Sequence, residues 1–360
     1  MSKALIAMSG GVDSSVAAYL MQQQGFECIG CTMKLYQNED VGISKSHTCC
    51  SLDDVEDARA VAYKLGMQYY VFNFSDKFKE TVIDKFVACY TNGLTPNPCI
   101  DCNHYMKFDK LFERSRLLNC DYIVTGHYAR IEKQGETFVL KKAVDGTKDQ
   151  SYVLYMMNQY QLSRILFPLG EMKKSEIRKI AGENGFVNAD KPDSQDICFV
   201  SGGNYAGVVE LHSARPVSPG DFIDKTGRLL GRHRGIIHYT IGQRKGLGIS
   251  SSEPLYVCDI DPVNNTVTLG TNEDLYKDGL IASDFNWISE SPPDGPIRCK
   301  AKIRYRQTEQ PATATVHEDG SVSVVFDYPQ RAITPGQSVV LYDEDIVLGG
   351  GVITKSGTCL

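Results

Sequence analysis

KALIAMSGGVDSSVAAYLMQQQG, residues 3 to 25, carries the strongest structural signal in the chain. It opens with a short apolar run typical of a buried strand, passes through the turn SGGVDS at residues 9 to 14, and continues as a helix that ends at Gly25. Gly10 and Gly11 allow backbone conformations closed to other residues, so successive N–H groups can converge on a phosphate. The N-terminus of the following helix favours the same anion. The stretch therefore predicts a phosphate-binding loop between a strand and a helix.

The polar side chains of this loop add to the prediction. Ser9, Ser14 and Ser15 offer hydroxyl groups to the same anion. Asp13 would repel a phosphate directly, so we expect it to act through Mg²⁺. No lysine follows at the Walker position, and the stretch is therefore not a GxxxxGK[ST] loop.

Alternation of strand-like and helix-like segments continues to about residue 200, which predicts a parallel sheet with helices on both faces. Strands are expected at residues 26–33, 69–74 and 121–127, a hairpin at 130–145, and helices at 53–66, 78–90, 108–119, 162–170 and 172–185. From about Pro216 the chain turns to short strands broken by Gly, Pro and Asn. The fold class is therefore α/β followed by two small β-barrel-like modules, with expected boundaries at 1–204, 205–278 and 279–360.

Composition is ordinary for a soluble protein, with 42% hydrophobic residues, 23% charged residues and a net charge of −6. No apolar run is long enough for a bilayer span, and no secretory signal is evident, so we expect a cytoplasmic protein without a membrane partner. The negative net charge alone argues against a nucleic-acid partner. However, residues 225–252 carry six Lys or Arg and residues 297–308 carry five, with no acid in either stretch. Such stretches are typical of a surface that binds phosphates.

Twelve cysteines are more than usual for a cytosolic chain of this length. Six of them lie in patterned segments, where packing in the core explains them, and Cys359 lies in a C-terminal tail that we expect to be frayed. The exceptions are Cys49-Cys50, Cys99, Cys102 and Cys198, which we place in turn-rich loops. Cys99 and Cys102 stand in TPNPCIDCN, residues 95 to 103. A pair with this spacing can hold a metal, form a disulfide or carry sulfur.

The SGGVDS loop resembles that of the PP-loop ATP pyrophosphatases, which cleave ATP between its α- and β-phosphates and pass AMP to a substrate oxygen. With TPNPCIDCN, TGHYAR (125–130), KDQSYVLY (148–155) and DSQDICFV (193–200), the whole chain resembles the tRNA-specific 2-thiouridylases. The resemblance implies that ATP activates the C2 oxygen of a tRNA uridine. Sulfur then replaces this oxygen and is delivered as a cysteine persulfide. It implies ATP and Mg²⁺ as cofactors, and tRNA and a persulfide donor (a cysteine desulfurase or a sulfur-relay protein) as partners.

The resemblance also implies roles for individual residues. Cys102 matches the nucleophile, Cys198 the persulfide carrier, and Asp13 belongs to the catalytic loop. The ATP contacts fall on Ala7, Met8, Ser9, Gly10, Gly11, Val12, Asp13, Ser14, Met33 and Gly126. The tRNA contacts fall on Asn97, Pro98, Cys99, His127, Lys148, Asp149, Gln150, Arg304, Tyr305 and Gln337.

One departure from the family pattern is that Cys99 stands where an aspartate, proposed as an acid or base, is usual. Asp101 is close, but two positions on. Three interpretations of the thiols stay open: a persulfide relay, an iron–sulfur cluster held by Cys99, Cys102 and Cys198, or a zinc site. Two other functions also remain. An amidating PP-loop ligase would have no use for the two reactive cysteines, and an RNA-binding module with a vestigial loop would release no AMP.

Overall fold

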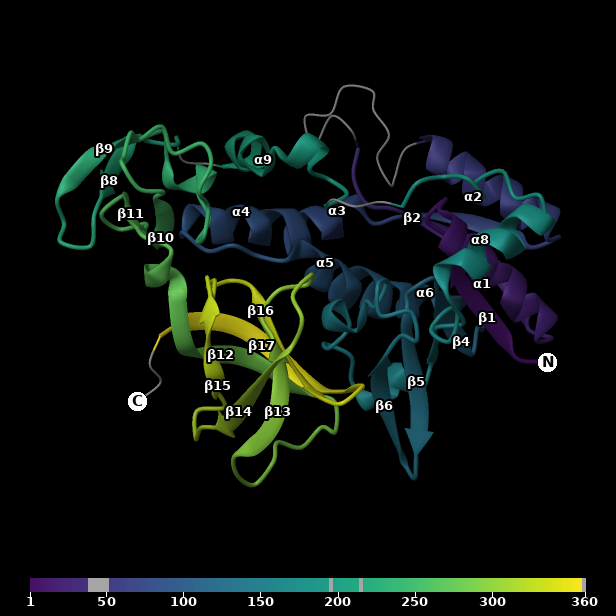
Figure 1. Ribbon diagram of the computed structural model, residues 1–360. Helices are drawn as coiled ribbons and strands as arrows, with labels where there is room; N and C mark the ends of the chain where they lie inside the picture. Colours follow the sequence, from purple (N-terminus) through teal and green to yellow (C-terminus); the bar gives the residue numbers. More distant parts are fainter. Residues whose placement is uncertain (38–51, 194–196, 214–215, 358–360) are drawn as a thin grey trace.

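The computed structural model describes residues 1–37, 52–193, 197–213 and 216–357. The Cys49-Cys50 pair and Cys359 lie outside these described residues. Figure 1 shows an α/β region at the N-terminal end, a small central β-sheet, and a C-terminal barrel below them. Within the described residues, no helix has both the length and the apolar character needed to cross a membrane.

The α/β region contains a five-stranded parallel sheet of order β3-β2-β1-β4-β7. Its strands are β1 (Lys3–Ala7), β2 (Glu27–Lys34), β3 (Gln68–Asn73), β4 (Tyr122–Thr125) and β7 (Ile165–Leu166). The order reverses between β1 and β4, so the loops after these two strands meet at a crevice where such sheets bind ligands. The helix expected at residues 162–170 is wrong, because its short apolar centre forms β7. A run this short does not distinguish a strand from a helix.

Helices cover both faces of the sheet, as expected. One face packs against α1 (Val12–Gln23), α2 (Leu52–Lys64) and α8 (Lys174–Glu183), with Ile6, Val16 and Val61 buried between them. The other face packs against a continuous helical segment formed by α5 (Pro98–Asp101), η3 (Cys102–Lys110) and α6 (Leu111–Leu117). The segment η3 is a π-helix, a wider turn that closes i to i+5 hydrogen bonds.

The placement of Cys99 and Cys102 in a loop is wrong, because both belong to this helical segment. Asn97 is its N-cap, and its side-chain oxygen accepts a hydrogen bond from the Cys99 N–H at 3.2 Å. Pro98 occupies the first helical position, where a missing N–H costs nothing. The turn-forming residues of TPNP are therefore the start signal of a helix.

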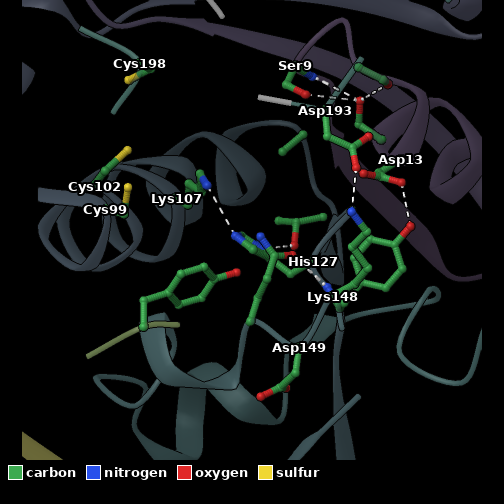
Figure 2. Close-up of a pocket in the computed structure, with 18 of the residues that line it drawn as sticks. Ser9, Asp13, Cys99, Cys102, Lys107, His127, Lys148, Asp149, Asp193 and Cys198 are labelled. Carbon is green, nitrogen blue, oxygen red and sulfur yellow. Dashed lines mark hydrogen bonds and ion pairs between the residues drawn. The ribbon is translucent and has the colours of Figure 1, made fainter. Parts of the chain in front are cut away.

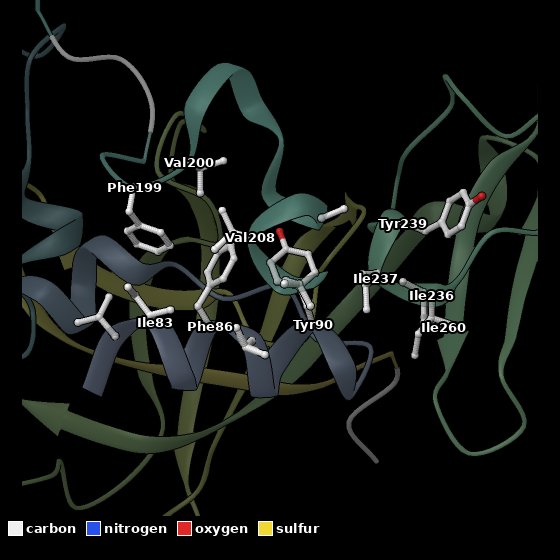
Figure 3. Close-up of a cluster of buried hydrophobic side chains, with 14 of the residues drawn as sticks. Ile83, Phe86, Tyr90, Phe199, Val200, Val208, Ile236, Ile237, Tyr239 and Ile260 are labelled. Atoms are coloured by element: carbon white, nitrogen blue, oxygen red, sulfur yellow. The ribbon is translucent and has the colours of Figure 1, made fainter. Parts of the chain in front are cut away.

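The central module is a four-stranded sheet of order β10-β11-β8-β9. Its strands are β8 (Gly220–Ile223), β9 (Leu229–His233), β10 (Tyr256–Asp261) and β11 (Thr266–Gly270). One hydrophobic cluster joins this sheet to α3 (Ser75–Phe78), η2 (Lys79–Ile83), α4 (Asp84–Thr91) and α9 (Tyr205–His212). In Figure 3, Phe199 packs over Phe86 in this cluster, at 5.3 Å between ring centroids. The residue that follows Cys198 is thus firmly anchored.

The C-terminal module is a closed six-stranded barrel. Its strands are β12 (Tyr276–Trp287), β13 (Ile297–Lys302), β14 (Gln310–Val316), β15 (Val322–Arg331), β16 (Ser338–Asp343) and β17 (Ile346–Ser356), and β12 pairs with β17 to close it. The expected hairpin forms from β5 (Ala129–Gln134) and β6 (Thr137–Lys142). Because β6 pairs with β17, the hairpin fastens the barrel to the α/β region.

Substitution of Gly10 should reveal how tightly the phosphate loop is packed. Gly10 has φ +76°, and an added Cβ would lie 2.4 Å from the backbone oxygen of Asp54. We expect Gly10→Ala to lower the free energy of unfolding by about 3 kcal/mol, measured by urea denaturation. Gly25→Ala is the matched control. Gly25 has φ +83° but nothing within 4 Å, so this variant should lose only about 1 kcal/mol of backbone strain. Equal losses in the two variants would contradict the packing argument.

Candidate active site

A cavity of about 1040 Å³ lies where the loops after β1 and β4, the α5–η3 segment and the barrel meet. All three predicted catalytic residues line it: Asp13, Cys102 and Cys198. The lining also includes the predicted ATP contacts Ala7, Met8, Ser9, Gly11, Val12, Ser14, Met33 and Gly126, and the predicted tRNA contacts Pro98, Cys99, His127, Lys148, Asp149, Gln150 and Tyr305. The chain thus brings together residues as far apart in the sequence as Ala7 and Tyr305.

Four predicted residues do not line this cavity. Gly10 faces the backbone of α2, and Asn97 caps α5. Arg304 and Gln337 line an adjoining cavity of about 420 Å³. There the Arg304 side chain donates hydrogen bonds to the backbone oxygens of residues 241 and 332. The Gln337 side chain donates to the backbone oxygens of residues 95 and 96. Gln337 therefore holds the segment before Cys99 in place beside the barrel, whereas Arg304 joins the barrel to the central module.

The phosphate loop is held by its own hydroxyl groups and by a close neighbour. The Ser14 hydroxyl donates to the Gly11 carbonyl at 3.0 Å and accepts from the Ser9 N–H at 3.1 Å. Gly126, in the loop after β4, approaches so closely that an added Cβ would lie 2.8 Å from the Ser14 nitrogen. The two loops therefore form one surface at the crevice of the sheet.

Asp13 belongs to a network of charges that sequence reasoning missed. Its carboxylate accepts hydrogen bonds from Lys174 Nζ at 2.7 Å and from the Tyr128 hydroxyl at 2.6 Å. Lys174 also pairs with Asp193 at 2.8 Å, and Asp193 pairs with Lys148 at 2.9 Å. Burial raises the pKa of Asp193, but these lysines hold it below its ordinary value. A signal was present, because Lys174 opens α8 at the end where a helix dipole disfavours a cation.

The predicted tRNA contacts Lys148, Asp149 and Gln150 form one turn after β6. Asp149 accepts hydrogen bonds from the Ala143 and Ser151 N–H groups at 3.1 and 3.2 Å. Gln150 accepts from the Tyr128 N–H at 2.9 Å, beside the contact of that tyrosine with Asp13. The turn is therefore rigidly joined to the phosphate-loop side of the cavity.

The three candidate thiols lie along one side of the cavity. Cys99 is exposed, and Cys102 and Cys198 are half-buried. In Figure 2, Cys99 and Cys102 lie next to each other on the helical segment, and Cys198 lies on the separate segment above them. Burial raises the pKa of the Cys102 thiol to about 11, although the nearby Lys107 charge lowers it. Cys102 is therefore protonated at neutral pH in this arrangement.

Asp101 does not replace the missing carboxylate at position 99. It is buried, it does not line the cavity, and it pairs with Lys85 of α4 at 2.6 Å. Burial raises its pKa, against the opposing effect of Lys85. The Asp101 carboxylate therefore joins two helices instead of facing the substrate.

His127 and Lys107 form a pair next to the thiols. The His127 ring contacts Thr125 Oγ1 through Nδ1 at 2.7 Å and Lys107 Nζ through Nε2 at 3.3 Å. Burial, followed by the Lys107 charge, lowers the pKa of His127 well below its ordinary value. A lysine can only donate, so Nε2 accepts and the proton of the neutral ring is on Nδ1.

Comparison with known proteins decides the family. Residues 2–202 match the protein-family model described as "tRNA methyl transferase HUP domain". Residues 210–271 match the family's "PRC-barrel domain" model, and residues 277–353 match the "Aminomethyltransferase beta-barrel domain" model. The tRNA-specific 2-thiouridylase MnmA of Clostridioides difficile is 53% identical over 358 residues, which cover 98% of each chain. MnmA 1 of Clostridium botulinum (strain Loch Maree) is 50% identical over 353 residues, which cover 98% of this chain and 99% of that one. The chain belongs to the tRNA-specific 2-thiouridylase family. Members of this family use ATP, which fits the phosphate loop described above.

An iron–sulfur cluster or a zinc site would need Cys99, Cys102 and Cys198 to lie close together. Among the residues that the structure describes, no three His, Cys, Asp or Glu side chains gather closely enough to hold a metal ion. Cys99, Cys102 and Cys198 are all among these residues. The three-thiol donor set of a cluster or of a zinc site is therefore not assembled in this arrangement.

The two basic stretches differ in whether their charges face the cavity. In the first, Lys225, Arg228 and Arg232 pair with aspartates outside or at the edge of the stretch. In the second, Arg298 pairs with Asp327, while Lys300 is exposed on β13. The Lys302 and Arg306 side chains line the cavity. The second stretch is therefore the better candidate surface for a nucleic-acid backbone.

Proposed function

We propose that this chain is a tRNA-uridine 2-sulfurtransferase that acts on the wobble uridine in the cytoplasm. It adenylates the C2 oxygen with ATP, replaces that oxygen with sulfur, and releases pyrophosphate and AMP. One observation carries this proposal: the SGGVDS loop, Cys102 and Cys198 line the same cavity. An amidating ligase would need the loop without the thiols, and a methyl-transfer enzyme would need neither a pyrophosphate loop nor a second reactive cysteine.

In the first step, the phosphate loop and the N-terminus of α1 bind the phosphates of ATP. The uridine C2 oxygen attacks the α-phosphorus, and the bond to pyrophosphate breaks. Asp13 and Asp193 fit Mg²⁺, which binds through one or two carboxylates together with substrate phosphates. Once bound, Mg²⁺ would neutralise phosphate charge. Lys174, which lies between the two carboxylates, keeps them in place before the nucleotide arrives.

In the second step, Cys198 carries a terminal sulfur received from a persulfide donor, a cysteine desulfurase or a sulfur-relay protein. The deprotonated terminal sulfur attacks C2, and the C2–O bond breaks with its electron pair leaving on AMP. The Cys102 thiol then releases its proton to solvent, a loss that the nearby Lys107 charge favours, and the resulting thiolate attacks the Cys198 sulfur. A disulfide forms between the two cysteines, the bond to the transferred sulfur breaks, and 2-thiouridine is released. A cellular dithiol must reduce the disulfide before the next turnover.

A uridine must leave the anticodon stack for its C2 oxygen to reach this cavity. We assign the tRNA backbone to the surface around Lys300, Lys302 and Arg306, where phosphate contacts would set position but not sequence. The rigid turn at Lys148–Gln150 would support the extruded nucleotide from the other side.

The iron–sulfur route is the second candidate, and the replacement of the usual aspartate by Cys99 favours it. It requires Cys198 to join Cys99 and Cys102 around iron. One experiment tests both candidates: protein purified without oxygen is analysed for iron and acid-labile sulfide, then given tRNA, ATP and a persulfide donor. We expect 2-thiouridine by nucleoside mass spectrometry, equimolar AMP, and activity that does not follow iron content. Activity proportional to iron would favour the cluster, and absence of 2-thiouridine with either preparation would refute thiolation.

A further inference from the structure

The π-helical turn η3 gives Lys107 a position that a regular helix would not. In an α-helix, residues five apart point about 140° away from each other around the axis. The wider turn of η3 instead hydrogen-bonds residues five apart, as shown by the Leu111 N–H, which donates to the Met106 carbonyl. Cys102 and Lys107 are five apart, and both side chains line the large cavity. The turn therefore brings a cation to the same side as the thiol.

Within the described part of the chain, Lys107 forms no ion pair with a carboxylate. Of the other lysines in the cavity wall it shares this with Lys302 of the barrel, whose ammonium lies over the Tyr152 and Tyr305 rings at 5.8 Å from each centroid. Lys142, Lys148 and Lys191 also line the cavity, but each pairs with a carboxylate. Among the residues that the structure describes, the hydrogen-bond partner of the Lys107 ammonium is the His127 ring, at 3.3 Å from Nε2. An ammonium has three donors, so two remain for another acceptor.

The Lys107 ammonium lies near both the phosphate loop, where adenylation is proposed, and Cys102, which takes part in sulfur transfer. His127 follows Gly126, which packs against the backbone of the phosphate loop at Ser14. On the other side, the Lys107 charge is close enough to lower the pKa of Cys102. Figure 2 shows Lys107 between the cysteines and the loop that carries Ser9 and Asp13. An anion between the loop and the thiols would therefore meet the free donors of Lys107.

We propose that Lys107 is a catalytic residue that binds the nucleotide α-phosphate, which becomes the AMP phosphate of the adenylated uridine. The proposal rests on the proposed function, in which this phosphate lies between the pyrophosphate subsite and the attacking sulfur. The neutral His127 orients the ammonium by accepting one of its hydrogen bonds. As the C2–O bond breaks, its electron pair passes to the AMP phosphate, and the Lys107 charge stabilises the anion that forms. No proton leaves Lys107 in this step.

Binding of AMP and of adenosine to the free protein tests this contact without requiring thiolation. Isothermal titration calorimetry would compare the wild type, Lys107→Gln, Lys107→Arg and the control Lys110→Gln, whose lysine lies on the same turn but pairs with Glu113. We expect Lys107→Gln to lose about tenfold in AMP affinity and nothing in adenosine affinity. Lys107→Arg should retain most of the AMP affinity because it keeps the charge. Lys110→Gln should bind both ligands normally.

Several results would overturn the assignment. AMP affinity that is unchanged in Lys107→Gln, or a wild type that binds AMP no more tightly than adenosine, would remove the phosphate contact. Equal loss of AMP and adenosine affinity in Lys107→Gln would show damage to the pocket instead. Loss of AMP affinity in Lys107→Arg as large as in Lys107→Gln would exclude a role of the charge. Failure of the thiolation assay with a normal AMP result would refute the proposed function and leave this subsite standing.

Discussion

A Cys198→Ser protein is expected to adenylate tRNA and release pyrophosphate normally, but to form no 2-thiouridine. The hydroxyl of serine cannot carry a terminal sulfur, whereas the phosphate loop does not depend on this residue. Tyr36 and Phe199 hold the segment in place through the Cys198 carbonyl and the hydrophobic cluster, so the backbone should keep its position in the variant. Pyrophosphate release and nucleoside mass spectrometry on the same sample measure the two halves of the reaction separately.

Cys102→Ser should block the same relay one step later. The sulfur has then reached C2 but stays joined to Cys198, so tRNA should accumulate on the protein in a linkage that a dithiol releases. Cys99→Ser is the matched control, because Cys99 lies on the same turn and lines the same cavity. A relay predicts that this variant keeps its activity. Loss of activity in all three variants would support a three-thiol cluster. Full activity of Cys198→Ser would refute both the persulfide relay and the cluster.

Much of this site could be predicted because the sequence signals are local. SGGVDS follows a buried strand and precedes a helix, and TGH follows another strand. The strand order that brings these two loops together is the usual consequence of alternating strands and helices. Motif positions therefore predict where the crevice lies, and most of the predicted site residues line the cavity.

The residues that were missed depend on backbone geometry that local patterns do not encode. Lys107 looks like an ordinary helix-surface lysine in the sequence, and only the π-helical turn places it beside Cys102. Lys174 is far from Asp13 along the chain and meets it only after α8 packs against α1. The prediction of a loop at TPNP is wrong because helix start signals and turn signals use the same residues. A tertiary contact, absent from any short window, decided the outcome for Lys174, whereas local backbone geometry that the residue pattern leaves open decided it for Lys107 and TPNP.

Asp13→Asn should slow adenylation by at least about a hundredfold, because the carboxylate charge is lost where phosphate charge develops. Asparagine keeps the size of the side chain and still accepts a hydrogen bond from Tyr128. However, it can neither pair with Lys174 nor supply a charged oxygen to Mg²⁺. tRNA affinity should be unchanged, since the proposed backbone surface lies on the barrel. Pyrophosphate release with tRNA and no sulfur donor measures the first step, and filter binding measures tRNA affinity.

Asp57→Asn is the matched control for this experiment. Asp57 also pairs with a lysine, Lys191, near the phosphate loop, yet it does not line the cavity. Its loss should leave pyrophosphate release close to normal. If both variants slow the first step equally, the effect comes from loss of support for the loop and not from charge at the phosphates. Normal pyrophosphate release by Asp13→Asn would mean that Lys174 and the loop N–H groups suffice for adenylation, and the role given to Asp13 would be wrong.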